Sequence, residues 1–123
     1  MSISFPYSID YHPSAPTIEV AIKAKDLLNL EALLDTGADA TMIPLDLLNR
    51  IGATFLRNSR IYGATGHSVS ADIYLVEVKI GNHWIPGIYA AGITANTEPI
   101  IGRDVLNQLI VTLDGTSGIT EIS

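Results

Sequence analysis

Asp35 stands where a carboxylate could act as an acid or base catalyst. It follows the apolar residues Leu33 and Leu34, which end a predicted strand, and precedes Thr36 and Gly37, which form a turn. A carboxylate at such a place is held rigidly in a partly dry environment, which suits proton transfer. Asp-Thr-Gly occurs once in the 123 residues. Any given tripeptide can occur by chance in a chain of this length, so the triplet alone is weak evidence. The catalytic interpretation therefore depends on the elements that would position Asp35.

The composition argues against several other kinds of chemistry. With no cysteine, the chain has neither a disulfide framework nor a thiolate nucleophile. His12, His67 and His83 lack the spacing of metal ligands, so neither a metal nor another cofactor is expected. A net charge of −6 without a basic cluster argues against nucleic acid and anionic membranes as partners. The 47% hydrophobic content predicts a very apolar core or a surface that pairs with another subunit.

The chain has the length of one domain with one core. Residues 1–16 contain three prolines, which exclude a helix and predict an extended N-terminal arm, either loose or lying over the domain or a partner. Residues 17–123 are the predicted domain. The N-terminus lacks the basic and apolar regions of a signal peptide, and no stretch reaches membrane-spanning length, so a cytoplasmic protein is expected.

Strand patterns dominate the domain. Alternation of apolar and polar residues, glycine-rich turns and short gaps predict hairpins over most of it. The predicted strands begin at Thr17 and then cover Asn29–Asp35, Arg57–Tyr62, His67–Ile80, His83–Ala90, Ile110–Leu113 and Ile119–Ile122. Short helices are predicted over Pro44–Ile51, with the proline in the first turn, and from after Gly102 through Leu109. The pattern predicts an all-β fold with two short helices, closed on itself or packed as two sheets.

Three side chains of this pattern carry specific expectations. Trp84 and Ile88 share one face of the strand at 83–90 and are expected in the core. Pro86 lacks the N–H that a central strand needs, so it predicts an edge strand or a bulge.

Three segments together resemble the retropepsin-like aspartic proteases. Leu34–Asp39 is similar to the active-site turn of that family, Tyr62–Gly66 lies where the family has its flap, and Ile100–Leu106 is similar to its hydrophobic–hydrophobic–glycine segment and following helix. They occur in the family's order and approximate spacing, over roughly residues 18–122. The helix at Pro44–Ile51 and the terminal hairpin look more like the bacterial and eukaryotic-cytosolic members than the viral ones. The resemblance implies a closed β-barrel with a flap hairpin.

The resemblance also implies an activity and a partner. Two adjacent carboxylates can share one proton and serve as both base and acid, and aspartic proteases are an established example. Because this chain has one Asp-Thr-Gly, the second carboxylate must be Asp35 of another copy. A two-fold homodimer that cleaves extended peptides, with the active site on its axis, is the expectation. Ile119–Ile122 alternates like a strand that could pair at that two-fold interface.

The family's roles map onto individual positions of this chain. Asp35, Thr36 and Gly37 would be the catalytic triplet, with Thr36 bonding across the axis and Gly37 admitting the substrate backbone. Residues expected to contact substrate are Ala38, Asp39, Tyr62, Gly63, Ala64 and Ile101. Residues expected to support the site are Ile100, Gly102 and Arg103, the last of these as an ion pair with Asp39.

Several alternatives stay open at this point. Tyr62 is either a flap residue or an ordinary strand aromatic. Asp46, Asp72, Asp104 and Asp114 are expected to face solvent. Three interpretations of the whole chain remain. It is an aspartic endopeptidase, or a non-catalytic peptide-binding or dimerisation module on the same scaffold, or a small barrel in which Asp-Thr-Gly occurs by chance.

Overall fold

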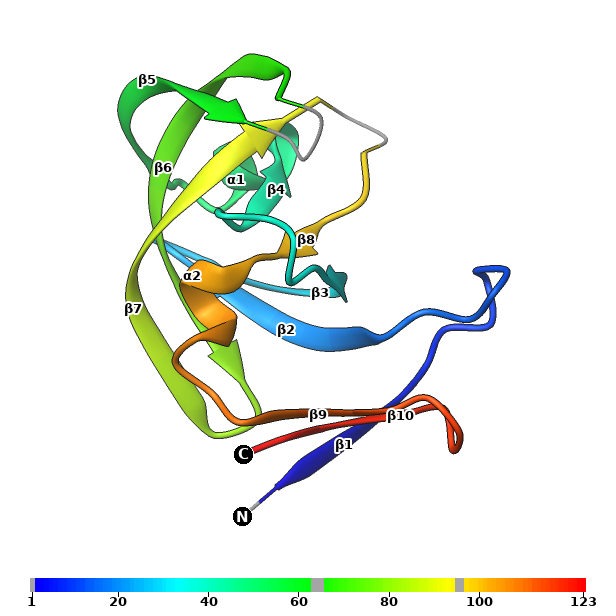
Figure 1. The fold of residues 1–123 in the computed structure, drawn as a ribbon. Coiled ribbons are helices and arrows are strands. Elements are labelled where there is room, and N and C mark those ends of the chain that lie inside the picture. The colour runs from blue at the N-terminus through cyan, green and yellow to red at the C-terminus, as the bar shows by residue number, and fades with distance from the viewer. Residues whose placement is uncertain (1, 63–65, 95–96) are drawn as a thin grey trace.

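The computed structural model describes residues 2–62, 66–94 and 97–123 (Figure 1). Within them the chain forms short strands and two short helices. In chain order these are β1 (Ile3–Pro6), β2 (Thr17–Lys23), β3 (Leu27–Leu34), β4 (Met42–Pro44), α1 (Leu45–Arg50), β5 (Thr54–Tyr62), β6 (Ser68–Ile80), β7 (His83–Ile93), β8 (Ile100–Ile101), α2 (Arg103–Leu106), β9 (Val111–Asp114) and β10 (Ile119–Ile122). The predicted all-β fold with two short helices is confirmed.

The larger sheet curls almost into a ring. Its strand order is β2-β3-β8-β4-β7-β6-β5, and β2 also pairs with β6. This second pairing joins strands that are far apart in the order, so the sheet closes on itself and β5 extends beyond the closure. Figure 1 shows β6 and β7 as long curved strands that bend around this ring. Closure removes free strand edges, which would otherwise attract other chains.

The alternating sequence pattern explains the core inside the ring. Val76, Val78 and Ile80 of β6 are buried, while the residues between them are more accessible. Because successive side chains of a strand point to opposite faces, this alternation turns one face of each strand inward. The two short helices contribute Leu48 and Val105 to the same core, and both are completely buried.

β8 is the element that positions the candidate site. Its two residues lie between two strands that come much earlier in the chain: it runs parallel to β3 and antiparallel to β4. The segment between β3 and β4, residues 35–41, is therefore anchored on both sides by the same short strand. This arrangement needs contacts across more than 60 residues of sequence, and it fixes the turn that contains Asp35.

A separate three-stranded sheet contains both chain termini. Its order is β1-β10-β9, and it lies below the ring in Figure 1. Residues 3–6 of the predicted arm therefore lie on the domain as β1, rather than loose in solvent. The arm is also joined to the ring, since the Leu34 N–H donates to the Pro16 carbonyl oxygen at 3.0 Å.

Two expectations for β7 had different outcomes. The expected bulge is confirmed: the register of β7 against β6 shifts between Val76 and Val78, opposite the segment that contains Pro86. The expected burial of Trp84 is wrong, because 46% of its surface is exposed. Ile88 is buried, and the shift in register between the two residues explains why Trp84 and Ile88 lie on opposite faces of β7. The Trp84 ring lies instead on the surface, near the ammonium groups of Lys23 and Lys79.

In the described residues, neither helix has the length and apolarity that crossing a membrane requires.

Candidate active site

Asp35 lies directly after the last residue of β3, at the start of a tight turn. Its N–H donates to the Ile101 carbonyl oxygen at 3.0 Å, which continues the pairing of β3 with β8 by one residue. Its Oδ1 accepts the Gly37 N–H at 2.9 Å, and its carbonyl oxygen accepts the Ala38 N–H at 3.2 Å. The carboxylate is therefore held by the backbone of its own turn, and Asp35 is only partly buried.

Gly37 lies close to the carboxylate of its own turn. A Cβ on this residue would lie 3.2 Å from Asp35 Oδ1, tighter than nine in ten real Cβ contacts, so the carboxylate would have to shift by a few tenths of an ångström. A side chain would therefore disturb the hydrogen bond that orients the carboxylate. Both Thr36 and Gly37 are exposed, so the turn presents its tip to solvent in a single chain.

The turn is supported by the neighbouring segment Ile100, Ile101 and Gly102. The two isoleucines pair with Leu33 and Leu34, and Ile101 is completely buried in the core. Ile101 therefore holds the turn in place and offers no surface to a substrate in the single chain. A Cβ on Gly102 would lie 2.8 Å from the Ala40 carbonyl group, a contact with backbone that cannot move aside cheaply.

Arg103 ties the two ends of the turn together. Its Nη1 donates to the Thr36 carbonyl oxygen at 2.6 Å, and its Nη2 forms an ion pair with Asp39. Its backbone N–H also donates to the Ala38 carbonyl oxygen at 2.9 Å. Because both charged side chains are substantially exposed, the ion pair itself adds little stability. The three contacts of Arg103 instead orient the turn, and its ion pair with Asp39 is the one that the family resemblance implied.

Thr41 and Asp104 are joined by a hydrogen-bond network that the sequence pattern did not predict. Asp104 was expected to face solvent, which is wrong: it is partly buried and accepts the Thr41 N–H at 3.0 Å and the Thr41 hydroxyl at 2.8 Å. The same hydroxyl oxygen accepts the Gly102 N–H at 3.2 Å. Thr41 is completely buried, so these bonds connect β8 and α2 to the end of the turn.

Asp72 is partly exposed. Its carboxylate accepts a hydrogen bond from Asn58 across β5 and β6, and this bond is exposed to solvent. Asp46 and Asp114 are exposed as expected.

Replacing Thr41 with valine is expected to lower the free energy of unfolding by about 1–3 kcal/mol, because the Asp104 carboxylate and the Gly102 N–H lose a buried partner. Chemical denaturation measures this loss. Thr54→Val, at an exposed position of β5, is the matched control and is expected to change stability by less than about 0.5 kcal/mol. Equal stability of the two variants would contradict the role assigned to Thr41.

The hairpin of β5 and β6 lies where the flap was predicted. Its strands pair in register from Arg57↔Ile73 to Tyr62↔Ser68. Gly63 and Ala64 lie outside the described residues, and of Tyr62 only the backbone is described, so the roles predicted for these three residues stay predictions. Ala38 is partly buried within the turn, and Asp39 is exposed beside it.

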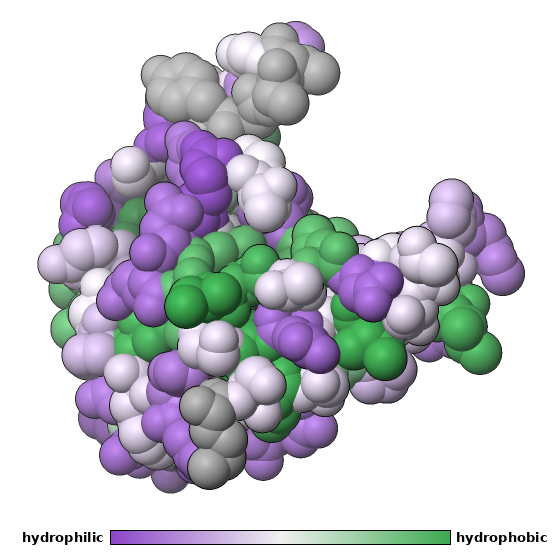
Figure 2. Space-filling model, turned by 60° about the horizontal axis from the view of Figure 1, so that its bottom comes forward, coloured by the Kyte–Doolittle hydropathy of each residue, from purple (hydrophilic) through white to green (hydrophobic). Residues whose placement is uncertain are grey.

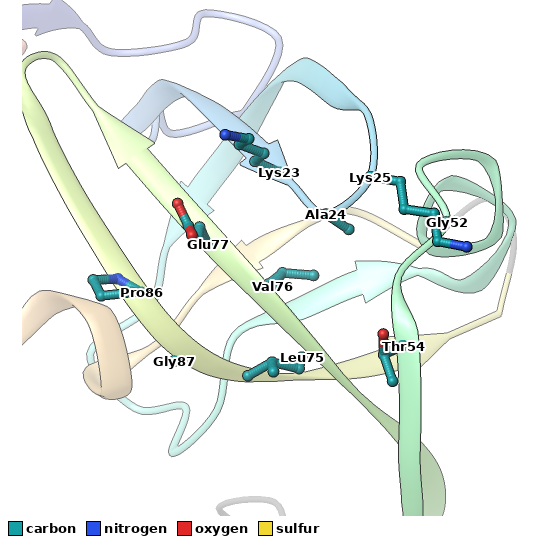
Figure 3. A pocket seen from close by; sticks show the side chains of 10 residues that line it. All are labelled: Lys23, Ala24, Lys25, Gly52, Thr54, Leu75, Val76, Glu77, Pro86 and Gly87. Atoms are coloured by element: carbon teal, nitrogen blue, oxygen red, sulfur yellow. The ribbon is translucent and has the colours of Figure 1, made fainter.

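Two cavities matter for locating a ligand. One of about 380 Å³ lies next to the turn, between β5, β7 and α2, and Asp39 and Ala40 belong to its lining. The other, of about 410 Å³, shares Gly87 with the first and is lined further by residues such as Lys23, Gly52 and Pro86 (Figure 3). No residue predicted for the site lines this second cavity, so the first one is the candidate extension of the active site.

The described residues contain no group of three or more His, Asp or Glu side chains arranged to hold a metal ion. Within the same residues, the hydrogen bonds of Asp35 join it to backbone groups of its own turn and of β8. One chain therefore presents one oriented, accessible carboxylate.

Comparison with known proteins agrees with this geometry. The family model described as "gag-polyprotein putative aspartyl protease" matches residues 18–108. The chain is 30% identical over 90 residues to the Arabidopsis thaliana protein DNA-DAMAGE INDUCIBLE 1, which covers 69% of this chain but only 22% of that protein. The chain thus spans about a fifth of the length of this curated relative.

Two solved structures are similar over most of the chain. EIAV protease, in complex with the inhibitor HBY-793, is 29% identical, with a TM-score of 0.60 over 85% of this chain and 93% of that one. A retropepsin-like aspartic protease from Rickettsia conorii is 13% identical, with a TM-score of 0.70 over 99% of this chain and 90% of that one. The second likeness concerns the fold alone, and it includes the terminal sheet.

Proposed function

Since the chain belongs to the retropepsin-like aspartyl protease family, we propose that two copies pair about a two-fold axis and hydrolyse peptide bonds with a dyad made of Asp35 from each. The observation that carries this proposal is the turn at residues 35–39, which presents one oriented carboxylate at an exposed tip. One carboxylate cannot both activate water and protonate the leaving amine, whereas two adjacent ones can.

The proposed reaction needs no group beyond these two carboxylates and water. The ionised carboxylate removes a proton from a water molecule, and the water oxygen bonds to the peptide carbonyl carbon. The protonated carboxyl group donates its proton toward the substrate. The C–N bond then breaks, the nitrogen leaves as an amine with a proton from the dyad, and the carbonyl carbon becomes a carboxylic acid. Gly37, with no side chain, leaves room for the substrate backbone beside the dyad.

Exposed apolar residues support the proposed homodimer. Ile3, Leu113 and Ile119 of the terminal sheet, and Ile110 just before it, are all exposed, and Ile110 has 70% of its surface accessible. Figure 2, in which the underside of Figure 1 comes forward, shows hydrophobic side chains in the middle of this face, interrupted by polar ones. Exposed apolar area of this kind is typical of surfaces that pair with another chain.

β10 itself is not available for strand pairing with a partner. Within one chain it already lies between β1 and β9, so both of its edges are occupied. The expectation that Ile119–Ile122 pairs across the two-fold axis is therefore wrong for this structure. The free edges of the terminal sheet belong to β1 and β9, and we place the interface at these strands and at the exposed tip of the turn.

The proposed substrate is an extended peptide lying between the turn and the β5–β6 hairpin. Peptides of this kind are held by main-chain hydrogen bonds and selected by side-chain pockets. Ala38 and Asp39 would contact it from the turn, while Tyr62, Gly63 and Ala64 would close over it and exclude water.

Digestion of a peptide library tests the proposal. The wild-type chain and its Asp35→Asn variant are incubated with the library from mildly acid to neutral pH, and products are identified by mass spectrometry. Cleavage by the wild type alone is the expected result. Cleavage that survives the substitution would overturn the proposed dyad. Peptide binding without any cleavage by the wild type would instead favour a non-catalytic binding or dimerisation module.

A further inference from the structure

The cavity of about 380 Å³ beside the turn is lined by both apolar and charged residues. Ile61, Ile73 and Ile88 supply apolar lining. The polar groups, here called the rim, come from Arg57, Arg60, Ser59, Tyr89, Gln108, Asp39 and Asp104. These residues come from β5, β6 and β7, from the turn itself, and from α2 and the segment that follows it. The cavity is thus continuous with the proposed active site through Asp39 and Ala40.

The negative groups of this rim already have partners. Asp39 is paired with Arg103. Asp104 accepts both the N–H and the hydroxyl of Thr41, and its Oδ1 also accepts the Val105 N–H at 3.0 Å. Neither carboxylate therefore has to be neutralised by a further cation.

Arg57 and Arg60 are the cations of this rim, and neither has a carboxylate partner in the described part of the chain, where the single ion pair joins Arg103 to Asp39. Arg60 already donates to the Ser68 hydroxyl, whereas Arg57 lies over an aromatic ring. The guanidinium carbon of Arg57 lies 5.5 Å from the centre of the Tyr89 ring. Stacking on an aromatic ring orients the planar guanidinium and leaves its N–H edge available for a carboxylate. Arg57 is exposed, so a ligand can reach it.

Strand geometry places Arg57 on the inner side of the hairpin. It pairs with Ile73, and both have the same orientation as Ser59 and Ile61, because side chains two residues apart share a face. Arg60 belongs to the other face, where its guanidinium donates to the Ser68 hydroxyl at 2.9 Å. Arg60 also lines the cavity, but its side chain starts from the opposite face of the strand to that of Arg57.

We propose that this cavity is a subsite for an acidic side chain, Asp or Glu, of the peptide substrate, bound by the Arg57 guanidinium at a position distant from the cleaved bond. The inference rests on the proposed function, because it assigns a preference to the same groove. Two copies of the chain supply two such subsites, one at each end of the groove. Since the chain carries a net charge of −6, an acidic peptide is repelled elsewhere, and Arg57 supplies the local attraction.

A scan of paired peptides tests the subsite. One cleaved peptide is remade with Glu or with Gln at each outer position in turn, and kcat/KM is measured for every pair. For the wild type we expect about three- to tenfold faster cleavage with Glu at one outer position on each side, declining with added salt. In Arg57→Gln this Glu/Gln ratio falls to about one. Each Glu/Gln ratio compares two peptides cleaved by the same variant, so a general loss of activity leaves the ratio unchanged.

Arg50→Gln, an exposed arginine of α1 outside the cavity lining, is the matched control and keeps the wild-type ratio. A wild-type ratio near one at every position would overturn the inference, and so would a preference that survives Arg57→Gln. If the wild type cleaves no peptide, the proposed function fails instead. The binding affinity of the same peptide pairs is then measured by fluorescence anisotropy. The ratio of the affinities for the Glu and Gln peptides tests the subsite without any cleavage.

Discussion

Mixing the wild-type chain with about a tenfold excess of Asp35→Asn chains is expected to lower the activity per wild-type chain about tenfold, once subunits have exchanged. Each active site would need a carboxylate from both copies, so a wild-type chain paired with a variant chain has one carboxylate and one amide. The amide cannot take up a proton from water, and such a mixed dimer would be inactive. The surviving activity therefore follows the fraction of wild-type chains that meet one another.

An excess of Asp46→Asn chains is the matched control for this mixing experiment. Asp46 is an exposed carboxylate in the first turn of α1, so its loss removes the same charge without touching the turn. Because Asp46→Asn chains keep Asp35 and are active themselves, about a tenfold excess of them is expected to raise the activity per wild-type chain about elevenfold. Activity that is indifferent to the Asp35→Asn chains, with subunit exchange shown by fluorescence transfer, would mean that each chain works alone.

Gly102→Ala is expected to remove activity and to lower the melting temperature by roughly 10 °C. Its added Cβ would lie 2.8 Å from the Ala40 carbonyl carbon and oxygen and 2.9 Å from the Ala38 carbonyl oxygen. These neighbours are backbone atoms of the segment that carries Asp35, so relief of the overlap must displace the turn. Thermal unfolding and peptide hydrolysis measure the two effects.

Gly115→Ala, in the turn between β9 and β10, is the control for Gly102→Ala. No atom lies within 4 Å of a Cβ built at that position, so the same methyl group meets open space. We expect a melting temperature close to that of the wild type. If Gly102→Ala behaves like this control, the close approach of β8 to the turn does not constrain the site.

Local patterns were sufficient to predict the fold and the turn that carries Asp35. Alternation predicted most strands because one face of each is buried, and Gly52 after α1 has the positive φ of 69° that a helix end favours. The Asp-Thr-Gly triplet and the Ile-Ile-Gly segment are contiguous in sequence, so each could be recognised by itself. The interaction of Arg103 with Asp39 followed from the family resemblance.

Features that depend on distant contacts could not be predicted in this way. Thr41 and Asp104 are 63 residues apart, and nothing local distinguishes this aspartate from an exposed one at the start of a helix. Trp84 was assigned to the wrong face because a one-residue shift in register reverses which side chains are buried. The pairing of β1 with β10 joins the two ends of the chain, and only the folded sheet shows that β10 has no free edge.

Titration of the active site with a transition-state mimic tests the central claim most directly. A peptide analogue with a hydroxyl group in place of the cleaved bond favours enzymes built for that geometry, and calorimetry counts how many molecules bind per chain. If two Asp35 carboxylates share one site, one analogue binds per two chains, and Asp35→Asn abolishes tight binding. One analogue per chain, or tight binding unaffected by Asp35→Asn, would contradict a site built from two copies.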